Sequence, residues 1–130
     1  MSLAANPPPC PWAAAAPLIG DGAALRGILD LAGPETGQRI LVQMELDLAA
    51  TLSALQEAVV SGDFRTIRAQ SHVLVSIVGT IGAMRLHAAA RRLNESAHAE
   101  DAARVAFETA ELARDGAALA RAIGRIRAQA

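Results

Sequence analysis

Lysine is absent from this chain, and cysteine occurs only once. All twelve basic residues are arginine, which excludes Schiff-base chemistry and a lysine nucleophile. The single cysteine, Cys10, excludes an internal disulfide and a cysteine-based metal cluster. The formal net charge is −1, so the strongly basic balance that is typical of nucleic-acid-binding domains is missing. We therefore expect no nucleic-acid partner.

Aromatic residues and long apolar runs are also scarce. Aromatic residues make up 2% of a chain that is 52% hydrophobic, so the core has to be built from Ala, Leu, Ile and Val. Such a core suits close-packed helices better than a β-sandwich. No apolar run is long enough for a transmembrane helix, and the N-terminus lacks the pattern of a secretory signal. We expect one cytoplasmic domain without membrane contact.

Proline is concentrated at the N-terminus. Residues 1–19 hold five of the six prolines together with a run of alanines. Because proline fixes φ and removes a hydrogen-bond donor, we expect residues 1–19 to be a poorly ordered tail. Residues 20–130 then form the helical domain. Its first helix is short, begins after Asp21 and stops at Gly33, and its predicted apolar side comprises Leu25, Ile28, Leu29 and Leu31.

Four longer helices are predicted from apolar residues that recur every three or four positions. The first of them extends from Pro34 to a break at residues 61–63, with apolar positions Leu41, Met44, Leu48, Leu52, Leu55 and Val59. The next one follows Asp63, and a bend at Gly82 leads into the third. The polar residues 94–100 are interpreted as a loop before the last helix. Because short connections force antiparallel neighbours, we predict an all-α, antiparallel up-down-up-down four-helix bundle with a short additional N-terminal helix.

His72 is the residue with the clearest chemical potential. In the predicted helix after Asp63, one side carries an apolar stripe in which Ser71 fills a gap: Phe64, Ile67, Leu74, Val78 and Ile81. His72 follows Ser71 and falls at the edge of this stripe or outside it. An imidazole presented to solvent near neutral pH is a nucleophile available to a partner. A buried strand at residues 73–81 is the competing interpretation, which we reject because no second strand is available to pair with it.

The surroundings of this histidine resemble a known family. The segment from Ser61 to Leu93 is similar to histidine-containing phosphotransfer (HPt) domains, four-helix bundles that relay phosphate between response-regulator receivers. The positions that match the family's motif are His72, Leu74, Val75, Ser76, Gly82 and Leu86. The resemblance covers about residues 20–130. It implies that His72 accepts a phosphoryl group from a phospho-aspartate on one receiver domain and passes it to another in a two-component phosphorelay.

Val75 departs from the family, whose members usually place lysine at this position to steady the phosphate. Arg68, one turn before His72 on the same face, can reach the phosphoryl oxygens with its forked donors. Arg65, two turns back, can add steering. The alternative that both arginines are only the solvated side of an amphipathic helix stays open. Small residues let a partner approach closely, and the predicted docking residues are Arg65, Val75, Ser76 and Gly79.

The resemblance further implies the partners and the cofactor requirement. Receiver domains are the expected partners, together with a possible hybrid histidine kinase, and the chain is a phosphocarrier without catalytic activity of its own. No cofactor is expected on this chain, because Mg²⁺ resides on the receiver. No metal site is expected either, because His87 and His98 lack an i, i+4 partner.

Two questions stay open at this point. We expect a monomer, but the sequence also allows dimerisation through its alanine-rich faces. The alternative function is a degenerate HPt-like module that docks a receiver or a histidine kinase without carrying phosphate, since Val75 replaces the usual lysine.

Overall fold

Six helices and short connections make up residues 10–129, the part of the chain that the computed structural model describes. The helices are α1 (Pro11–Ile19), α2 (Ala23–Ala32), α3 (Pro34–Ser61), α4 (Phe64–Ile81), α5 (Met84–His98) and α6 (Ala102–Gln129). The alternative of a strand at residues 73–81 is wrong, because these residues lie within α4. None of the described helices combines the length and hydropathy needed to cross a bilayer.

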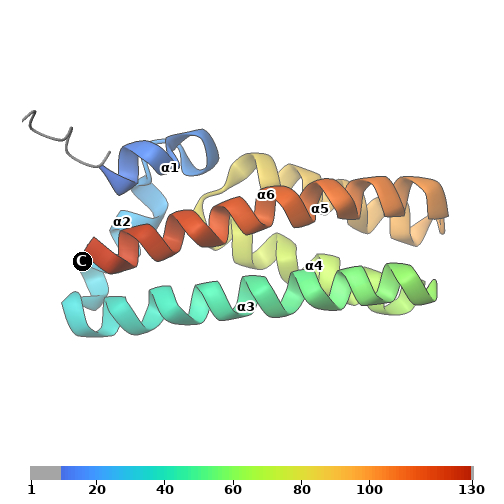
Figure 1. Ribbon diagram of the computed structural model, residues 1–130, viewed down its shortest axis with the longest axis horizontal. Helices are drawn as coiled ribbons and strands as arrows, with labels where there is room; N and C mark the ends of the chain where they lie inside the picture. The colour runs from blue at the N-terminus through green and yellow to red at the C-terminus, as the bar shows by residue number, and fades with distance from the viewer. Residues whose placement is uncertain (1–9, 130) are drawn as a thin grey trace, which may run out of the picture.

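The four long helices pack in a ring. Each of α3 to α6 packs against the next one along the chain, and α6 returns to pack against α3. Successive long helices run in opposite directions (Figure 1). Helices α3 and α6 have 28 residues each, whereas α4 has 18 and α5 has 15. The α4–α5 pair is therefore shorter than the α3–α6 pair by roughly 15 to 20 Å.

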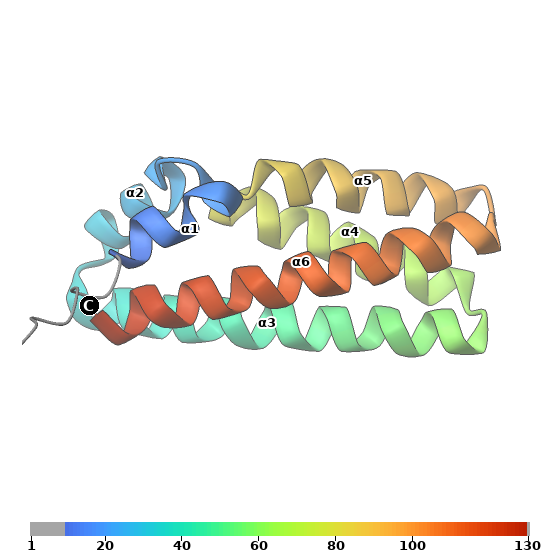
Figure 2. The same cartoon turned by 45° about the horizontal axis from the view of Figure 1, so that its top comes forward.

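The two short helices fill the end that the α4–α5 pair leaves open (Figure 2). Helix α1 packs against α5 and α6, and α2 packs against α3 and α4. Ala15 and Ile19 of α1 are buried. The guanidinium carbon of Arg26 in α2 lies 4.0 Å from the centroid of the Trp12 ring. These contacts join α1 and α2 to each other and to the longer helices.

Helix α1 corrects the prediction of a poorly ordered tail at residues 1–19, which is wrong for residues 11–19. Pro11 lies in the first turn of α1, where a missing N–H has no intrahelical partner to lose. The alanines that follow have high helix propensity, and burial against α6 stabilises the helix. Two short helices therefore precede the long ones instead of one, and the domain begins before residue 20. Residues 1–9 lie outside the described part.

The predicted breaks between helices are confirmed. Gly62 ends α3 with φ 70° and Gly82 ends α4 with φ 88°, a region that favours glycine. The Asp63 carboxylate accepts hydrogen bonds from the Thr66 hydroxyl (2.6 Å) and the Thr66 N–H (3.1 Å) at the start of α4. These hydrogen bonds lower the pKa of Asp63 below its ordinary value. At Gly82, a Cβ would lie 2.9 Å from the Cβ of Ala24 in α2, so the bend also needs a small residue for packing.

Most of the predicted apolar positions on the long helices are buried, and the local predictions are wrong at two places. Leu31 of α2 is 93% exposed, because α2 uses only a narrow face at the end of the molecule. Residues 94–98 are not a loop, because α5 continues to His98. Polar side chains in this stretch serve interhelical contacts. Ser96, for example, donates from its hydroxyl to the Glu108 carboxylate of α6 (3.0 Å).

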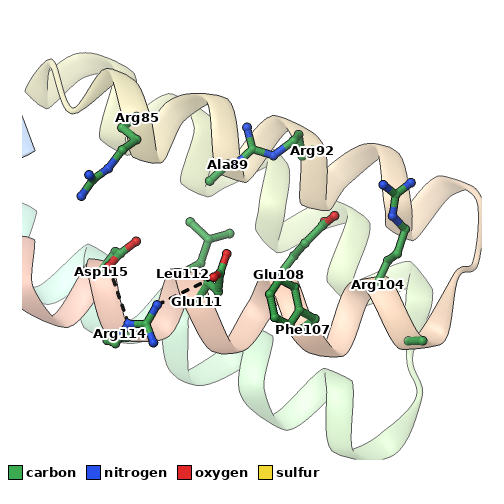
Figure 3. A pocket seen from close by; sticks show the side chains of 11 residues that line it. Arg85, Ala89, Arg92, Arg104, Phe107, Glu108, Glu111, Leu112, Arg114 and Asp115 are labelled. Atoms are coloured by element: carbon green, nitrogen blue, oxygen red, sulfur yellow. Dashed lines mark ion pairs between the residues drawn. The ribbon is translucent and has the colours of Figure 1, made fainter.

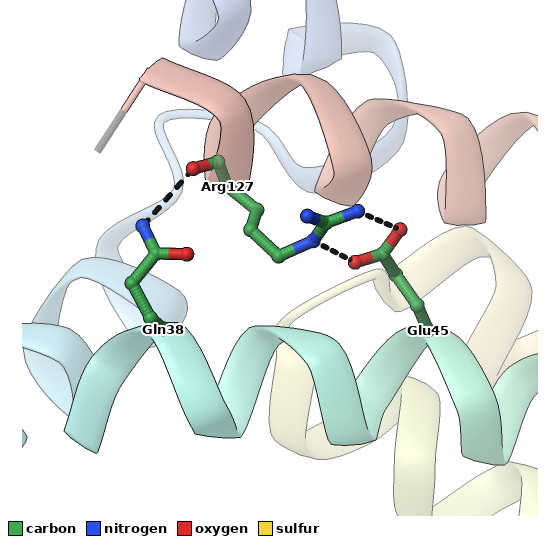
Figure 4. A network of polar contacts seen from close by, with 3 residues as sticks. All are labelled: Gln38, Glu45 and Arg127. Atoms are coloured by element: carbon green, nitrogen blue, oxygen red, sulfur yellow. Dashed lines mark hydrogen bonds and ion pairs between the residues drawn. The ribbon is translucent and has the colours of Figure 1, made fainter. Parts of the chain in front are cut away.

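The C-terminal end of α6 is attached to α3 by polar contacts (Figure 4). The guanidinium of Arg127 binds the Glu45 carboxylate at two points, Nε to Oε2 and Nη2 to Oε1. This hydrogen bonding raises the pKa of Arg127 above its ordinary value. Gln38 donates from Nε2 to the backbone carbonyl of Arg127 (3.0 Å). Both contacts fix the register of α6 on α3 over its last turns.

Gly116 allows α6 to approach α3 closely, which gives a test of the packing. A Cβ at Gly116 would lie 2.5 Å from Cδ1 of Leu52, a buried side chain of α3. We expect Gly116→Val to lower the free energy of unfolding by about 1–3 kcal/mol, because the packed core has to shift. Chemical denaturation followed by circular dichroism measures this loss.

The matched control for this prediction is Gly27→Val in α2. A Cβ at Gly27 meets nothing within 4 Å, so the same change there is expected to leave stability unchanged or to raise it slightly. An equal loss of stability at both positions would contradict the assignment of Gly116 to a close helix contact.

Candidate functional site

His72 is exposed on α4, as its position beside the apolar stripe predicts. Ser71, Leu74 and Val78 on the core-facing side of the helix are buried. Because these side chains face the interior, the imidazole is directed away from the core and toward solvent. A molecule that approaches α4 from outside can therefore reach the ring.

A surface depression of about 280 Å³ lies at His72. Two neighbouring helices line it: His72 and Val75 come from α4, and Arg91, Asn94 and Glu95 come from α5. The depression therefore combines an imidazole with a guanidinium, an amide and a carboxylate. Sequence analysis considered only residues on the histidine's own helix and missed all three side chains from α5.

Asn94 links α5 to the turn of α4 that precedes His72. Its Nδ2 donates to the backbone carbonyl of Arg68 (3.0 Å) and to the hydroxyl of Ser71 (3.0 Å). The Ser71 hydroxyl itself donates to the Arg68 carbonyl (3.1 Å). In an α-helix, the carbonyl of residue 68 is also the acceptor for the N–H of residue 72. The amide of Asn94 is thus attached to the backbone turn that carries the imidazole.

Arg68, the predicted phosphate-assisting residue, does not line this depression. Its Nη1 lies 4.0 Å from Oε1 of Glu100, a contact between a half-buried arginine and an exposed carboxylate. Arg65 is exposed on the same helix. Arg91 of α5 is therefore the arginine that the described structure places in the depression with His72.

The other predicted docking residues differ in their surroundings. Ser76 is exposed, whereas Val75 is half-buried and packs against the hydrophobic core. Only part of the Val75 side chain is therefore available to a docking partner. At Gly79, a Cβ would lie 3.0 Å from Cδ2 of His87, so packing of α4 against α5 already explains this small residue.

The remaining histidines have structural surroundings of their own. His87 contacts α4 at Gly79, and His98 is the last residue of α5. Within residues 10–129, no three side chains of His, Cys, Asp or Glu lie close enough together to hold a metal ion.

Replacement of Asn94 tests the link between α5 and the backbone at His72. We expect Asn94→Ala to lower the free energy of unfolding by about 1–3 kcal/mol, because two half-buried acceptors lose a donor. Chemical denaturation measures the loss, and amide hydrogen exchange at residues 71–73 is expected to become faster. Gln56→Ala, at an exposed amide of α3, is the control. A loss no larger than that of the control would show that the link contributes little.

Comparison with known proteins identifies the fold. No family model matches the chain, and no curated protein sequence matches it. The crystal structure of histidine-containing phosphotransfer protein B from Pseudomonas aeruginosa PAO1 is similar, with a TM-score of 0.78. The similarity covers 85% of this chain and 95% of that chain at 21% sequence identity. The chain therefore has the fold of a histidine-containing phosphotransfer domain.

Proposed function

We propose that this protein carries a phosphoryl group on His72 between response-regulator receiver domains. The observation that carries the proposal is the exposed imidazole in a depression formed by two helices, within a fold similar to that of a phosphotransfer protein. The four long helices then correspond to the antiparallel up-down-up-down bundle expected from the sequence. We propose that the relay operates in the cytoplasm and that receiver domains are its partners.

The chemistry requires little from the protein except position. A ring nitrogen of His72 attacks the phosphorus of a phospho-aspartate in line with the bond to the leaving carboxylate oxygen. The phosphorus–oxygen bond breaks as the phosphorus–nitrogen bond forms, and the carboxylate leaves with the electron pair. Transfer to a second receiver reverses these bonds. The receiver is expected to supply Mg²⁺ and most of the charge stabilisation, so this chain contributes alignment.

Arg91 is the residue that we propose as the cation beside the phosphoryl group. Val75 cannot provide the charge that the family usually places on α4, and Arg68 lies beside Glu100. Arg91 reaches the depression from α5, and its guanidinium can donate two hydrogen bonds to phosphoryl oxygens. Arg68, the residue favoured by the sequence, can add a second cation when a partner displaces Glu100. Arg65, Ser76 and the exposed part of Val75 then contact the receiver.

The absence of lysine at Val75 supports one alternative. In this alternative, the bundle docks a receiver or a histidine kinase and carries no phosphate. It predicts binding that His72→Ala leaves unchanged and Val75→Asp weakens, with no label transferred to the wild-type protein. The relay predicts label transfer, so a single experiment distinguishes the two functions.

The test of the relay is transfer of labelled phosphate from a phosphorylated receiver. We expect the wild-type protein to acquire an acid-labile label, and His72→Gln to acquire none while its helical circular-dichroism signal is unchanged. His98→Gln removes an exposed histidine at the end of α5 and serves as the matched control. Label that persists on the His72→Gln variant would place the phosphorylated residue elsewhere.

The same assay tests the role of Arg91. We expect Arg91→Ala to slow phosphotransfer about tenfold, the effect of losing one hydrogen bond to a charged group. Arg68→Ala is expected to have a smaller effect, and Arg121→Ala, at an exposed position of α6, none. If Arg68→Ala slows transfer more than Arg91→Ala does, the assignment made from the sequence is right and this one is wrong.

A further inference from the structure

Glu100, in the turn between α5 and α6, has a backbone conformation that glutamate rarely adopts. Its φ is 52°, and it is the only non-glycine residue with a positive φ within residues 10–129. The left-handed region brings Cβ too close to the following carbonyl oxygen, so glycine or asparagine usually occupies it at the end of a helix. Glutamate at this position therefore costs backbone energy that glycine would not cost.

The same hydrogen-bond pattern ends α3, α4 and α5. In each case the N–H of the residue with positive φ donates to the carbonyl three residues back, and the next N–H donates to the carbonyl five residues before it. The residue with positive φ is Gly62 after α3 and Gly82 after α4, but Glu100 after α5. The turn between α5 and α6 therefore requires the left-handed conformation, and it does not require a glutamate side chain.

The Glu100 side chain instead contacts Arg68 of α4. Oε1 of Glu100 lies 4.0 Å from Nη1 of Arg68, and no other carboxylate within residues 10–129 lies as close to this guanidinium. Because Asn94 contacts Ser71 and α5 runs antiparallel to α4, Glu100 lies about two helical turns beyond the level of His72 and past that of Arg68. The contact therefore draws the Arg68 guanidinium along α4, away from the imidazole.

Arg68 is otherwise well placed to act beside His72. The two residues are one turn apart on α4, and the backbone carbonyl of Arg68 is fixed by Nδ2 of Asn94 (3.0 Å). The Arg68 side chain nevertheless does not line the depression that contains His72. With the backbone held, the direction of the long side chain decides whether its guanidinium lies near the imidazole. Glu100 is the group that the structure provides to set this direction.

We propose that Glu100 holds Arg68 away from His72 in the free protein and releases it to the phosphoryl group when a phosphorylated receiver docks. This inference rests on the proposed phosphotransfer by His72. A phosphoryl group carries about two negative charges near neutral pH and offers three acceptor oxygens, so it competes successfully with one carboxylate for a guanidinium. An ion pair between partly exposed groups is weak, so docking can break it at small cost.

Phosphotransfer from a phosphorylated receiver measures this restraint. We expect Glu100→Gln to raise the transfer rate about two- to fivefold, the effect of removing one exposed ion pair that competes for the cation. In an Arg68→Ala background, the same change is expected to have no effect. Glu57→Gln, at an exposed carboxylate of α3, is the matched control. A rate that Glu100→Gln leaves unchanged, or an increase that persists without Arg68, contradicts the proposal.

A second measurement needs no receiver. Phenylglyoxal modifies accessible guanidinium groups, and peptide mass spectrometry reports the rate at each arginine. In the free protein, we expect Glu100→Gln to speed modification of Arg68 at least about twofold, and to leave the exposed Arg65 unchanged. Glu100→Gly is expected to give the same increase and also to raise the midpoint of chemical denaturation, because glycine adopts the left-handed conformation at no steric cost.

The two measurements separate this inference from the proposed relay. A wild-type protein that acquires no label contradicts the relay, whatever Arg68 does. A modification rate of Arg68 that does not respond to Glu100→Gln contradicts the restraint, even where His72 acquires label normally. Circular dichroism verifies that each variant retains its helical signal, so a loss of folding is not mistaken for the release of Arg68.

Discussion

The attachment of α5 to α4 through Asn94 is the constraint on which the site depends. The Asn94 amide binds the carbonyl of Arg68 and the hydroxyl of Ser71, one turn before His72. Gly79 lets the two helices approach closely, since a Cβ there would lie 3.0 Å from Cδ2 of His87 in α5. Because the contact fixes the rotation of α4 relative to α5, it determines which α5 side chains lie beside the imidazole. Arg91 and Glu95 are the α5 residues that this arrangement places in the depression with His72.

The fold was largely predictable because its signals are local. Apolar spacing indicated the long helices, and Gly62, Asp63 and Gly82 indicated where they end. The errors arose where tertiary contacts decide the structure. Helix α1 is stable because α3 and α6 extend beyond the shorter α4–α5 pair and leave surface for it to cover. No local pattern in the proline-rich segment reports the length difference between helices elsewhere in the chain.

The candidate site was predictable on α4 but not across to α5. The apolar stripe placed His72 outside the core. The α5 residues beside His72 could be identified only by pairing α4 with α5. A simple count would have indicated them. In an antiparallel pair that turns at Gly82 and Ala83, facing residue numbers sum to about 165, which places Ser71 near Asn94 and Gly79 near His87, as observed. The interpretation of residues 94–100 as a loop concealed this pairing, because polar residues were assumed to face solvent.

The absence of lysine connects the depression at His72 with the hollow between α5 and α6 (Figure 3). All cations of the chain are guanidinium groups, which bind phosphate and carboxylate oxygens at two points. Consecutive residues on a helix are separated by about 100°, so Arg91 and Arg92 of α5 lie in different hollows, one beside α4 and one beside α6. A cation at position 75 would lie on α4 alone. Arginines on α5 lie on both sides of that helix, and under the proposed relay Arg91 takes the place of a cation on α4.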